Sequence, residues 1–241
     1  YNTFVGYNAG SGTTSGEENV YLGYHAGKAN ATTSYNVFIG NGAGEFATGV
    51  QKSVFIGRQA AGAAAATGDD NTIVGYKAGY DLTTGYSNVV MGYATAENLT
   101  EGHKNVILGH RAGDSITTAH SNVAIGYQAL DSTTLGSENV AIGAYAGQAY
   151  VGTTSSVYGG LSVFLGHTAG YQMTGNASYG SVCVLGHAAG YSATGANLIT
   201  AVGNSAMYYA DGAKYNTAVG RVAGAYAKGT GSTHVGDSSG Y

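Results

Sequence analysis

A short motif recurs along the whole chain at a nearly constant interval. It reads Asn-(Thr/Val)-x-(Val/Ile/Leu)-Gly-x-x-Ala-Gly, and its first glycine occurs in fourteen copies. These anchor glycines are Gly6, Gly23, Gly40, Gly57, Gly75, Gly92, Gly109, Gly126, Gly143, Gly166, Gly186, Gly203, Gly220 and Gly236. Most intervals are 17 residues long, and two are extended to 23 and 20 residues. A period in this range is typical of solenoids, in which each repeat forms one coil and buries its apolar residues against its neighbours.

The residues before each anchor predict a short strand. Counted from the anchor glycine, position −3 is β-branched in almost every repeat, and position −1 is aliphatic or Met in all fourteen. Alternate residues of a strand point to the same side, so we expect positions −3 and −1 to share a core. Position −4 is Asn in nine repeats, which favours an Asn ladder at one corner of the coils. The sequence therefore predicts an all-β parallel β-solenoid of about 14 coils, forming a single domain over residues 1–241.

The composition fits this fold and argues against several functions. The chain has 42 Gly and no Pro, and each Gly in a helix interior costs about 1 kcal/mol relative to Ala, so long helices are not expected. A hydrophobic fraction of 44% is high enough for folding. The net charge of −4 lacks the basic surface that grips phosphate backbones, so nucleic acid is not an expected partner. No apolar run approaches the roughly 20 residues of a spanning helix, so this segment is not expected to insert into a membrane.

Position −2 is apolar as well, although it should point away from the interior of a coil if positions −3 and −1 point inward. A strand that is apolar on both faces is buried on both faces. An exposed stripe along all repeats would exceed the apolar patches of soluble monomers, so we expect a second chain of the same kind to cover it. The predicted interface of this homo-oligomer comprises Phe4, Tyr21, Phe38, Phe55, Ile73, Val90, Ile107, Ala124, Ala141, Phe164, Val184, Ala201, Ala218 and His234.

The repeats resemble those of a known family. The segments 122–126 and 139–143, both NVAIG, are similar to the head repeats of YadA-like trimeric autotransporter adhesins, and similar repeats occur in bacteriophage tail fibres. The resemblance covers essentially the whole chain. It implies a left-handed parallel β-roll and a parallel homotrimer, with the middle residue of each strand facing the trimer axis. The 17-residue period and the Ala-Gly after the anchor depart from the family, whose units are commonly shorter.

The resemblance implies an adhesive fibre segment rather than an enzyme. The expected location is extracellular, on a cell surface or a phage virion, and the expected partners are sister chains and a host-surface protein or glycan. A tail-fibre shaft or receptor-binding protein is the alternative. An ice-binding solenoid has less support, because the Thr pairs drift relative to the anchor glycine and form no regular array. The acidic residues form no acid/base pair and the His residues have no zinc spacing, so neither a catalytic site nor a cofactor or metal site is expected.

Two insertions interrupt the repeat, near residues 148–160 and 171–180. Loops that escape the packing of a scaffold often carry binding residues. A receptor-contact patch with Tyr150, Tyr158, Tyr171, Gln172 and Asn176 is therefore one interpretation, and a tolerated insertion without function is the other.

The position after the anchor, +1, is Tyr, His, Arg or Asn in most repeats. Such a column either contacts a partner, since a Tyr ring combines apolar area with a polar tip, or stacks as a ladder that closes the turn. His234, at position −2 of the last repeat, could also meet its copies around an ion or a water at the trimer axis.

Overall fold

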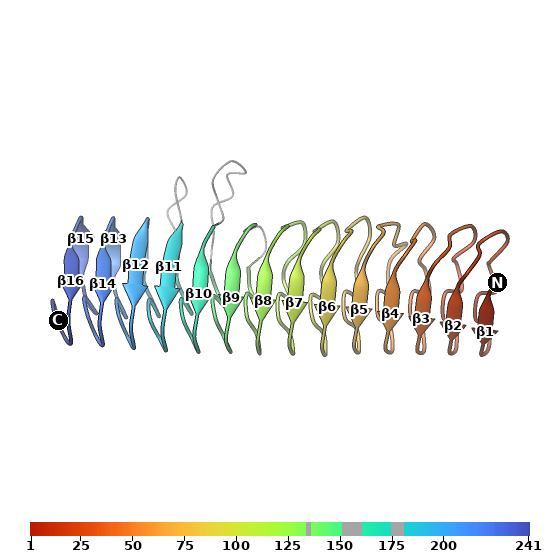
Figure 1. Ribbon diagram of the computed structural model, residues 1–241, viewed down its shortest axis with the longest axis horizontal. Helices are drawn as coiled ribbons and strands as arrows, with labels where there is room; N and C mark the ends of the chain where they lie inside the picture. Colours follow the sequence, from red (N-terminus) through yellow and green to blue (C-terminus); the bar gives the residue numbers. More distant parts are fainter. Residues whose placement is uncertain (134–135, 151–160, 175–180) are drawn as a thin grey trace. The chain divides into compact units, whose positions relative to one another are not determined.

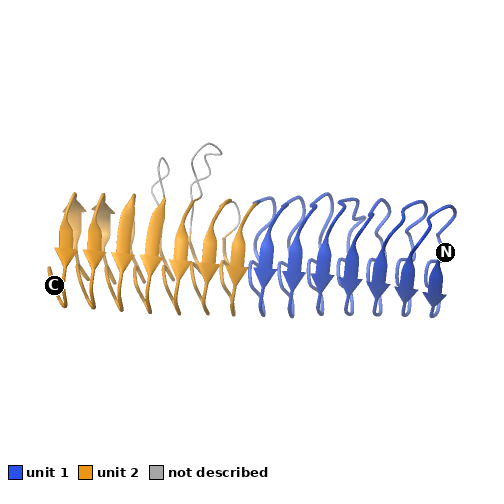
Figure 2. Cartoon of the chain, in the orientation of Figure 1, with its two compact units in different colours: residues 1–120 blue, residues 121–241 orange. Residues whose placement is uncertain are grey.

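A computed structural model describes residues 1–133, 136–150, 161–174 and 181–241. The chain is an all-β parallel β-solenoid of about 13 turns with a repeat of about 17 residues (Figure 1). The described residues form no helix. The chain divides into two compact units, Tyr1–His120 and Ser121–Tyr241 (Figure 2), which are described one after the other.

Each turn of the first unit contributes one strand to a parallel sheet. Neighbouring strands pair in register, so that equivalent residues of successive turns lie side by side, as Tyr21, Phe38 and Phe55 do. The strands are β1 (Thr3–Val5), β2 (Val20–Leu22), β3 (Val37–Ile39), β4 (Val54–Ile56), β5 (Thr72–Val74), β6 (Val89–Met91) and β7 (Val106–Leu108).

The second unit repeats this arrangement and adds a small second sheet. Its main parallel sheet contains β8 (Val123–Ile125), β9 (Val140–Ile142), β10 (Val163–Leu165), β11 (Val182–Leu185), β12 (Ile199–Val202), β14 (Thr217–Val219) and β16 (Thr233–Val235). The second sheet pairs β13 (Asp211–Lys214) with β15 (Lys228–Thr230), in parallel. The register of the main sheet continues across the 23-residue interval, because Phe164 of β10 lies beside Ala141 of β9.

The strands turn their middle residue inward, opposite to the orientation predicted from the sequence. Positions −3 and −1 are on the outside of the turn, half-buried or exposed. Position −2 is 0% exposed in Tyr21, Phe38, Phe55, Ile73, Val90, Ile107, Ala124, Ala141, Phe164, Val184, Ala201 and Ala218. The end-turn residues Phe4 and His234 are half-buried at the same position. The prediction that these fourteen residues face a partner chain is therefore wrong, because the interior of their own chain encloses them.

The inward side chains form a stacked core. The ring centroids of Phe4 and Tyr21 lie 4.9 Å apart, those of Tyr21 and Phe38 5.0 Å, and those of Phe38 and Phe55 4.6 Å. The rings face position +4 of the turn, where a Cβ on Gly44 would lie 2.8 Å from the ring of Phe38. Glycine at +4 therefore gives the aromatic ring its space.

Where the residue at −2 is smaller, other inward residues are larger. In the turns of Ile73, Val90 and Ile107, position +7 holds a buried aliphatic side chain, namely Leu82, Leu99 and Ile116. In the turns of Ala124 and Ala201, the glycine at +4 is replaced by the buried residues Leu130 and Met207. Because interiors are close-packed, this exchange of volume lets turns with different side chains stack with one register.

The predicted Asn ladder is confirmed, and it lies in the interior. In the middle of the first unit, the Nδ2 of Asn88 donates to the Oδ1 of Asn71 at 3.0 Å and to the carbonyl of Gly102 at 2.8 Å. The Oδ1 of Asn88 accepts from the backbone N–H of Asn105 at 3.0 Å. Where Ser53 replaces Asn, its Oγ accepts from the N–H of Asn71 at 3.0 Å. Each amide thus ties one turn to the turns before and after it.

Shortening a ladder residue should destabilise the fold according to the bonds that it loses. We expect Asn88→Ala to lower the free energy of unfolding by about 3 kcal/mol, because each buried polar group left unpaired costs about 1–3 kcal/mol. Asn88→Ser should lose less, because a hydroxyl can accept from the N–H of Asn105 as Ser53 does from Asn71. Urea unfolding followed by circular dichroism measures both values, and equal losses would contradict the ladder's role.

The buried phenol of Tyr21 predicts a loss of stability in alkali. Burial raises the pKa of Tyr21 well above its ordinary value, and the nearby Asn36 side chain offsets only part of this. Below about pH 10 the phenol is neutral in both states; above it the unfolded chain loses the proton first, so the stability falls as the pH rises. Tyr21→Phe gives this turn the phenyl ring that Phe38 and Phe55 have in theirs. This variant should therefore lose less stability between pH 8 and pH 11. Equal falls in the two melting temperatures would show that Tyr21 makes no such contribution.

Candidate functional site

The outward side of each main sheet is covered by apolar side chains, which we call the aliphatic face. They occupy positions −3 and −1 and are half-buried or exposed; the exposed fraction of Met91, for example, is 42%. In the first unit the face comprises Val20, Leu22, Val37, Ile39, Val54, Ile56, Thr72, Val74, Val89, Met91, Val106 and Leu108. In the second it comprises Val123, Ile125, Val140, Ile142, Val163, Leu165, Cys183, Leu185, Thr200, Val202, Thr217 and Val219. No member carries a charge.

The aliphatic face of each unit is comparable in area to the largest apolar patch of a soluble protein. With strands about 4.8 Å apart and a rise of about 3.3 Å per residue, the face of one unit measures about 30 Å by 10 Å, or about 300 Å². The largest apolar patch on a typical soluble monomer covers about 300–600 Å² and is often functional. Each unit therefore carries a patch of that size on one side of a regular parallel sheet.

The turns that follow the strands carry polar and aromatic ladders. At position +1, the ring of Tyr93 stacks on Tyr76 at 5.0 Å and on His110 at 4.9 Å, and the guanidinium of Arg58 lies 5.7 Å from the centre of the Tyr76 ring. The structure thus confirms the stacking interpretation of this column in the first unit. The rings nevertheless remain at the surface, with Tyr93 51% exposed.

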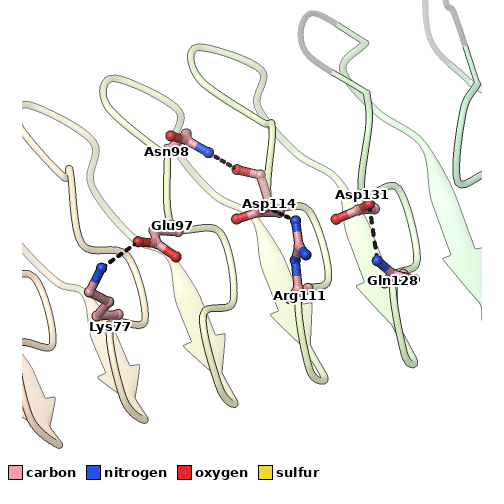
Figure 3. A network of polar contacts seen from close by, with 7 residues as sticks. All are labelled: Lys77, Glu97, Asn98, Arg111, Asp114, Gln128 and Asp131. Carbon is pink, nitrogen blue, oxygen red and sulfur yellow. Dashed lines mark hydrogen bonds and ion pairs between the residues drawn. The ribbon is translucent and has the colours of Figure 1, made fainter.

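Ion pairs and hydrogen bonds join positions +2 and +5 beside this ladder (Figure 3). The Nζ of Lys77 lies 3.0 Å from the Oε1 of Glu97, and a nitrogen of Arg111 lies 2.9 Å from the Oδ2 of Asp114. The second unit has an uncharged donor in the same arrangement, with Gln128 donating to the carboxylate of Asp131 at 3.4 Å. In the first unit these pairs place positive and negative groups side by side at the surface.

The pKa of Asp81 also depends on these charged groups. Asp81 lies at position +6 of the turn that carries Lys77. Burial raises the pKa of Asp81, and the negative charge of Glu97 adds to the increase, whereas the Lys77 ammonium opposes it. The Lys77 ammonium also lies 4.7 Å from the centre of the Tyr80 ring. The Lys77 ammonium therefore interacts with Glu97, with Asp81 and with the Tyr80 ring.

A recess interrupts the charged ladder in the first unit. Position +2 holds Lys77 in one turn and Arg111 two turns later, but the turn between them has Ala94. The short side chain leaves a recess of about 220 Å³, lined by Tyr76, Lys77, Tyr93, Ala94, Glu97, Arg111 and Asp114. It brings two cations, two carboxylates and two phenol rings together.

The predicted receptor-contact residues do not form one described patch. Tyr150 is only 1% exposed, and its hydroxyl lies 3.0 Å from the Oγ of Ser162, so its prediction as a contact residue is wrong. It fills the interior of a turn whose position −2 is Ala141. Tyr171 is half-buried and stacks on Tyr191 at 5.0 Å, and Gln172 is exposed. Tyr158 and Asn176 lie outside the described residues.

The described residues contain no group of three or more His, Cys, Asp or Glu that could hold a metal ion. The ring of His234 lies against Gly224 and Gly240 of its own chain, which contradicts a position facing a trimer axis. Within the described part of the chain, no helix has the length and hydropathy needed to cross a membrane.

The sequence analysis did not predict the pairing of position +2 with position +5. The available signal was the set of opposite charges at these positions, Lys77 with Glu97 and Arg111 with Asp114. Comparisons with protein-family models, with curated proteins and with solved structures find no match.

Proposed function

We propose that this chain is a non-enzymatic, adhesive fibre segment, displayed outside the cell on a cell surface or on a phage virion. In this proposal copies of the chain associate side by side through the aliphatic face and leave the polar ladders free to bind a host-surface protein or glycan. The aliphatic face carries the proposal, because an uncharged and regular apolar surface is stabilised when it leaves water.

A second copy of the same chain matches this face better than an unrelated partner. Its strands have the same spacing of about 4.8 Å, so its aliphatic columns can pack against these turn by turn. The face of one unit is smaller than the roughly 800 Å² per partner of a standard interface, so the side chains that flank it must contribute to the contact as well. The resemblance to trimeric adhesin heads favours three parallel copies, with positions −3 and −1 rather than −2 at their contact.

Ice binding receives no support from the Thr residues. The hydroxyls of Thr83 and Thr100 donate to the backbone carbonyls of Thr100 and Thr117, at 3.0 and 3.2 Å. Thr13 and Thr14 donate in the same way to the next turn. Each of these hydroxyls bonds to the backbone of the next turn, so it does not belong to an array that is free to bind ice.

Charges placed on the aliphatic face should separate the copies. We expect Ile39→Lys with Ile142→Lys, one substitution in each unit, to reduce the solution mass from about 72 kDa, for three chains of 24.1 kDa, to that of one chain. The reason is that a Lys in a desolvated apolar contact is unpaired, whereas on a single chain it lies at the surface. Sedimentation velocity measures the mass, and circular dichroism shows that the fold is retained.

The matched control adds the same charges at position +1 of the same turns, with Asn41→Lys and Ala144→Lys. This double variant should keep the mass of the native assembly. A native protein that sediments as one chain of 24.1 kDa would refute the proposed association.

The exposed thiol of Cys183 reports how the copies are oriented. It lies at position −3 of β11, on the aliphatic face, so parallel copies in register bring equivalent thiols close together. A short bismaleimide should then link two chains in the native protein at low concentration, and Cys183→Ser should remove the product seen by denaturing electrophoresis. An assembly of the expected mass that yields no linked chains would contradict the parallel arrangement.

A further inference from the structure

The recess around Ala94 presents donors and acceptors in alternation. Lys77 and Glu97 line one part of it, and Arg111 and Asp114 line the other. Their side chains are partly exposed, at 30% for Lys77 and 46% for Arg111, so a bound molecule can reach both cations. One oxygen of Asp114, Oδ1, is buried without a hydrogen-bond donor among the described residues, and in Figure 3 it points away from Arg111. Because this oxygen has no accessible surface, it is not among the groups that a ligand in the recess can reach.

These charges favour a neutral ligand. Lys77 and Arg111 each already contact a carboxylate, so an anion would compete with Glu97 and Asp114, and a cation would compete with Lys77 and Arg111. A hydroxyl both donates and accepts, so a molecule with several hydroxyl groups can bond to an ammonium and to a carboxylate without separating the pair. Polyols therefore fit the recess better than charged metabolites.

The tyrosine rings that line the recess further restrict the class of ligand. Both faces of the Tyr93 ring are occupied by the Tyr76 and His110 rings, so the recess meets ring edges and phenol groups. A flat aromatic ligand finds no free face on which to stack. A saturated ring can instead place its C–H groups against the Ala94 methyl and the ring edges.

The volume sets the size of the ligand. The recess of about 220 Å³ would hold about seven waters at roughly 30 Å³ each, which is room for one six-membered sugar ring. Because the lining side chains are partly exposed, the remainder of a longer glycan can continue into solvent.

We propose that this recess binds one neutral pyranose unit of a glycan, with Lys77, Glu97 and Arg111 as its hydrogen-bonding groups. The inference rests on the proposed adhesive function and names the chemistry of its partner. The repeat offers the site only in this part of the described chain, where Ala94 stands between two cations in the +2 column.

The test fills the recess without disturbing the backbone. Ala94 has a φ of 48°, and the same turn position carries Gln59 and Gln128 with φ of 58° and 52°, so Ala94→Gln places a side chain that this conformation already accepts. The matched control is Ala188→Gln, at position +2 of a turn without charged neighbours in that column, where φ is also 52°. The full chain and both variants are titrated with neutral methyl pyranosides of glucose, galactose, mannose and N-acetylglucosamine, with ligand-observed NMR as the readout.

We expect the native chain and Ala188→Gln to bind at least one pyranoside and Ala94→Gln to lose that binding. A second variant, Glu97→Gln, keeps the shape of the recess and should weaken binding about tenfold, since a hydrogen bond to a charged group is replaced by one to a neutral amide. Binding to none of the neutral pyranosides, or equal binding by Ala94→Gln, would overturn the inference. An assembly of the expected mass that binds no sugar refutes the recess alone, whereas a monomeric native chain refutes the proposed association, whatever the sugar result.

Discussion

The buried Asn at position −4 is the interaction on which the rest of the structure depends. Its side chain bonds to the backbone and amides of neighbouring turns, so it fixes both the register of the strands and the side that faces inward. An amide cannot be buried without partners at acceptable cost, and the backbone and amides of the stacked turns supply them here. The ladder continues past the 23-residue interval, where the N–H of Ser162 donates to the Oδ1 of Asn139 at 3.3 Å. The longer interval therefore does not break the stack.

The orientation of the Asn determines what each surface can do. Positions −4 and −2 lie on the same side of a strand, so an inward Asn brings the large residue at −2 into the turn and turns −3 and −1 outward. The chain interior then contains rings such as Phe38 and Phe55, while the aliphatic residues Val37 and Ile39 belong to the outer face. Lateral association, in our proposal, follows from this orientation.

The sequence was sufficient to predict the repeat, the positions of the strands, the parallel stacking and the Asn ladder, because each depends on periodicity. It did not reveal which side of the strand is inside, because positions −3, −2 and −1 are all apolar and hydrophobicity cannot distinguish them. The polar residue could have done so, since Asn19 and Asn36 share a side with Tyr21 and Phe38. Tyr150 lies in the predicted insertion by sequence, yet its side chain is buried and contacts Ser162 and Phe164. The recess depends on contacts between residues of different turns, such as Lys77 and Glu97, which a single repeat does not contain.

A solenoid of this kind can acquire a binding site by changing very few residues. At position +2 the backbone is left-handed with side chains as different as His25, Lys77 and Arg111, with φ between 52° and 59°. A non-glycine residue in this region costs about 1 kcal/mol or more, so the stacked turn imposes the conformation whatever the side chain is. The backbone conformation at position +2 is therefore fixed, whereas the chemical type of its side chain can vary. A single Ala between two cations is enough to open a recess, while Asn88 and Val90 of the same turn remain fully buried.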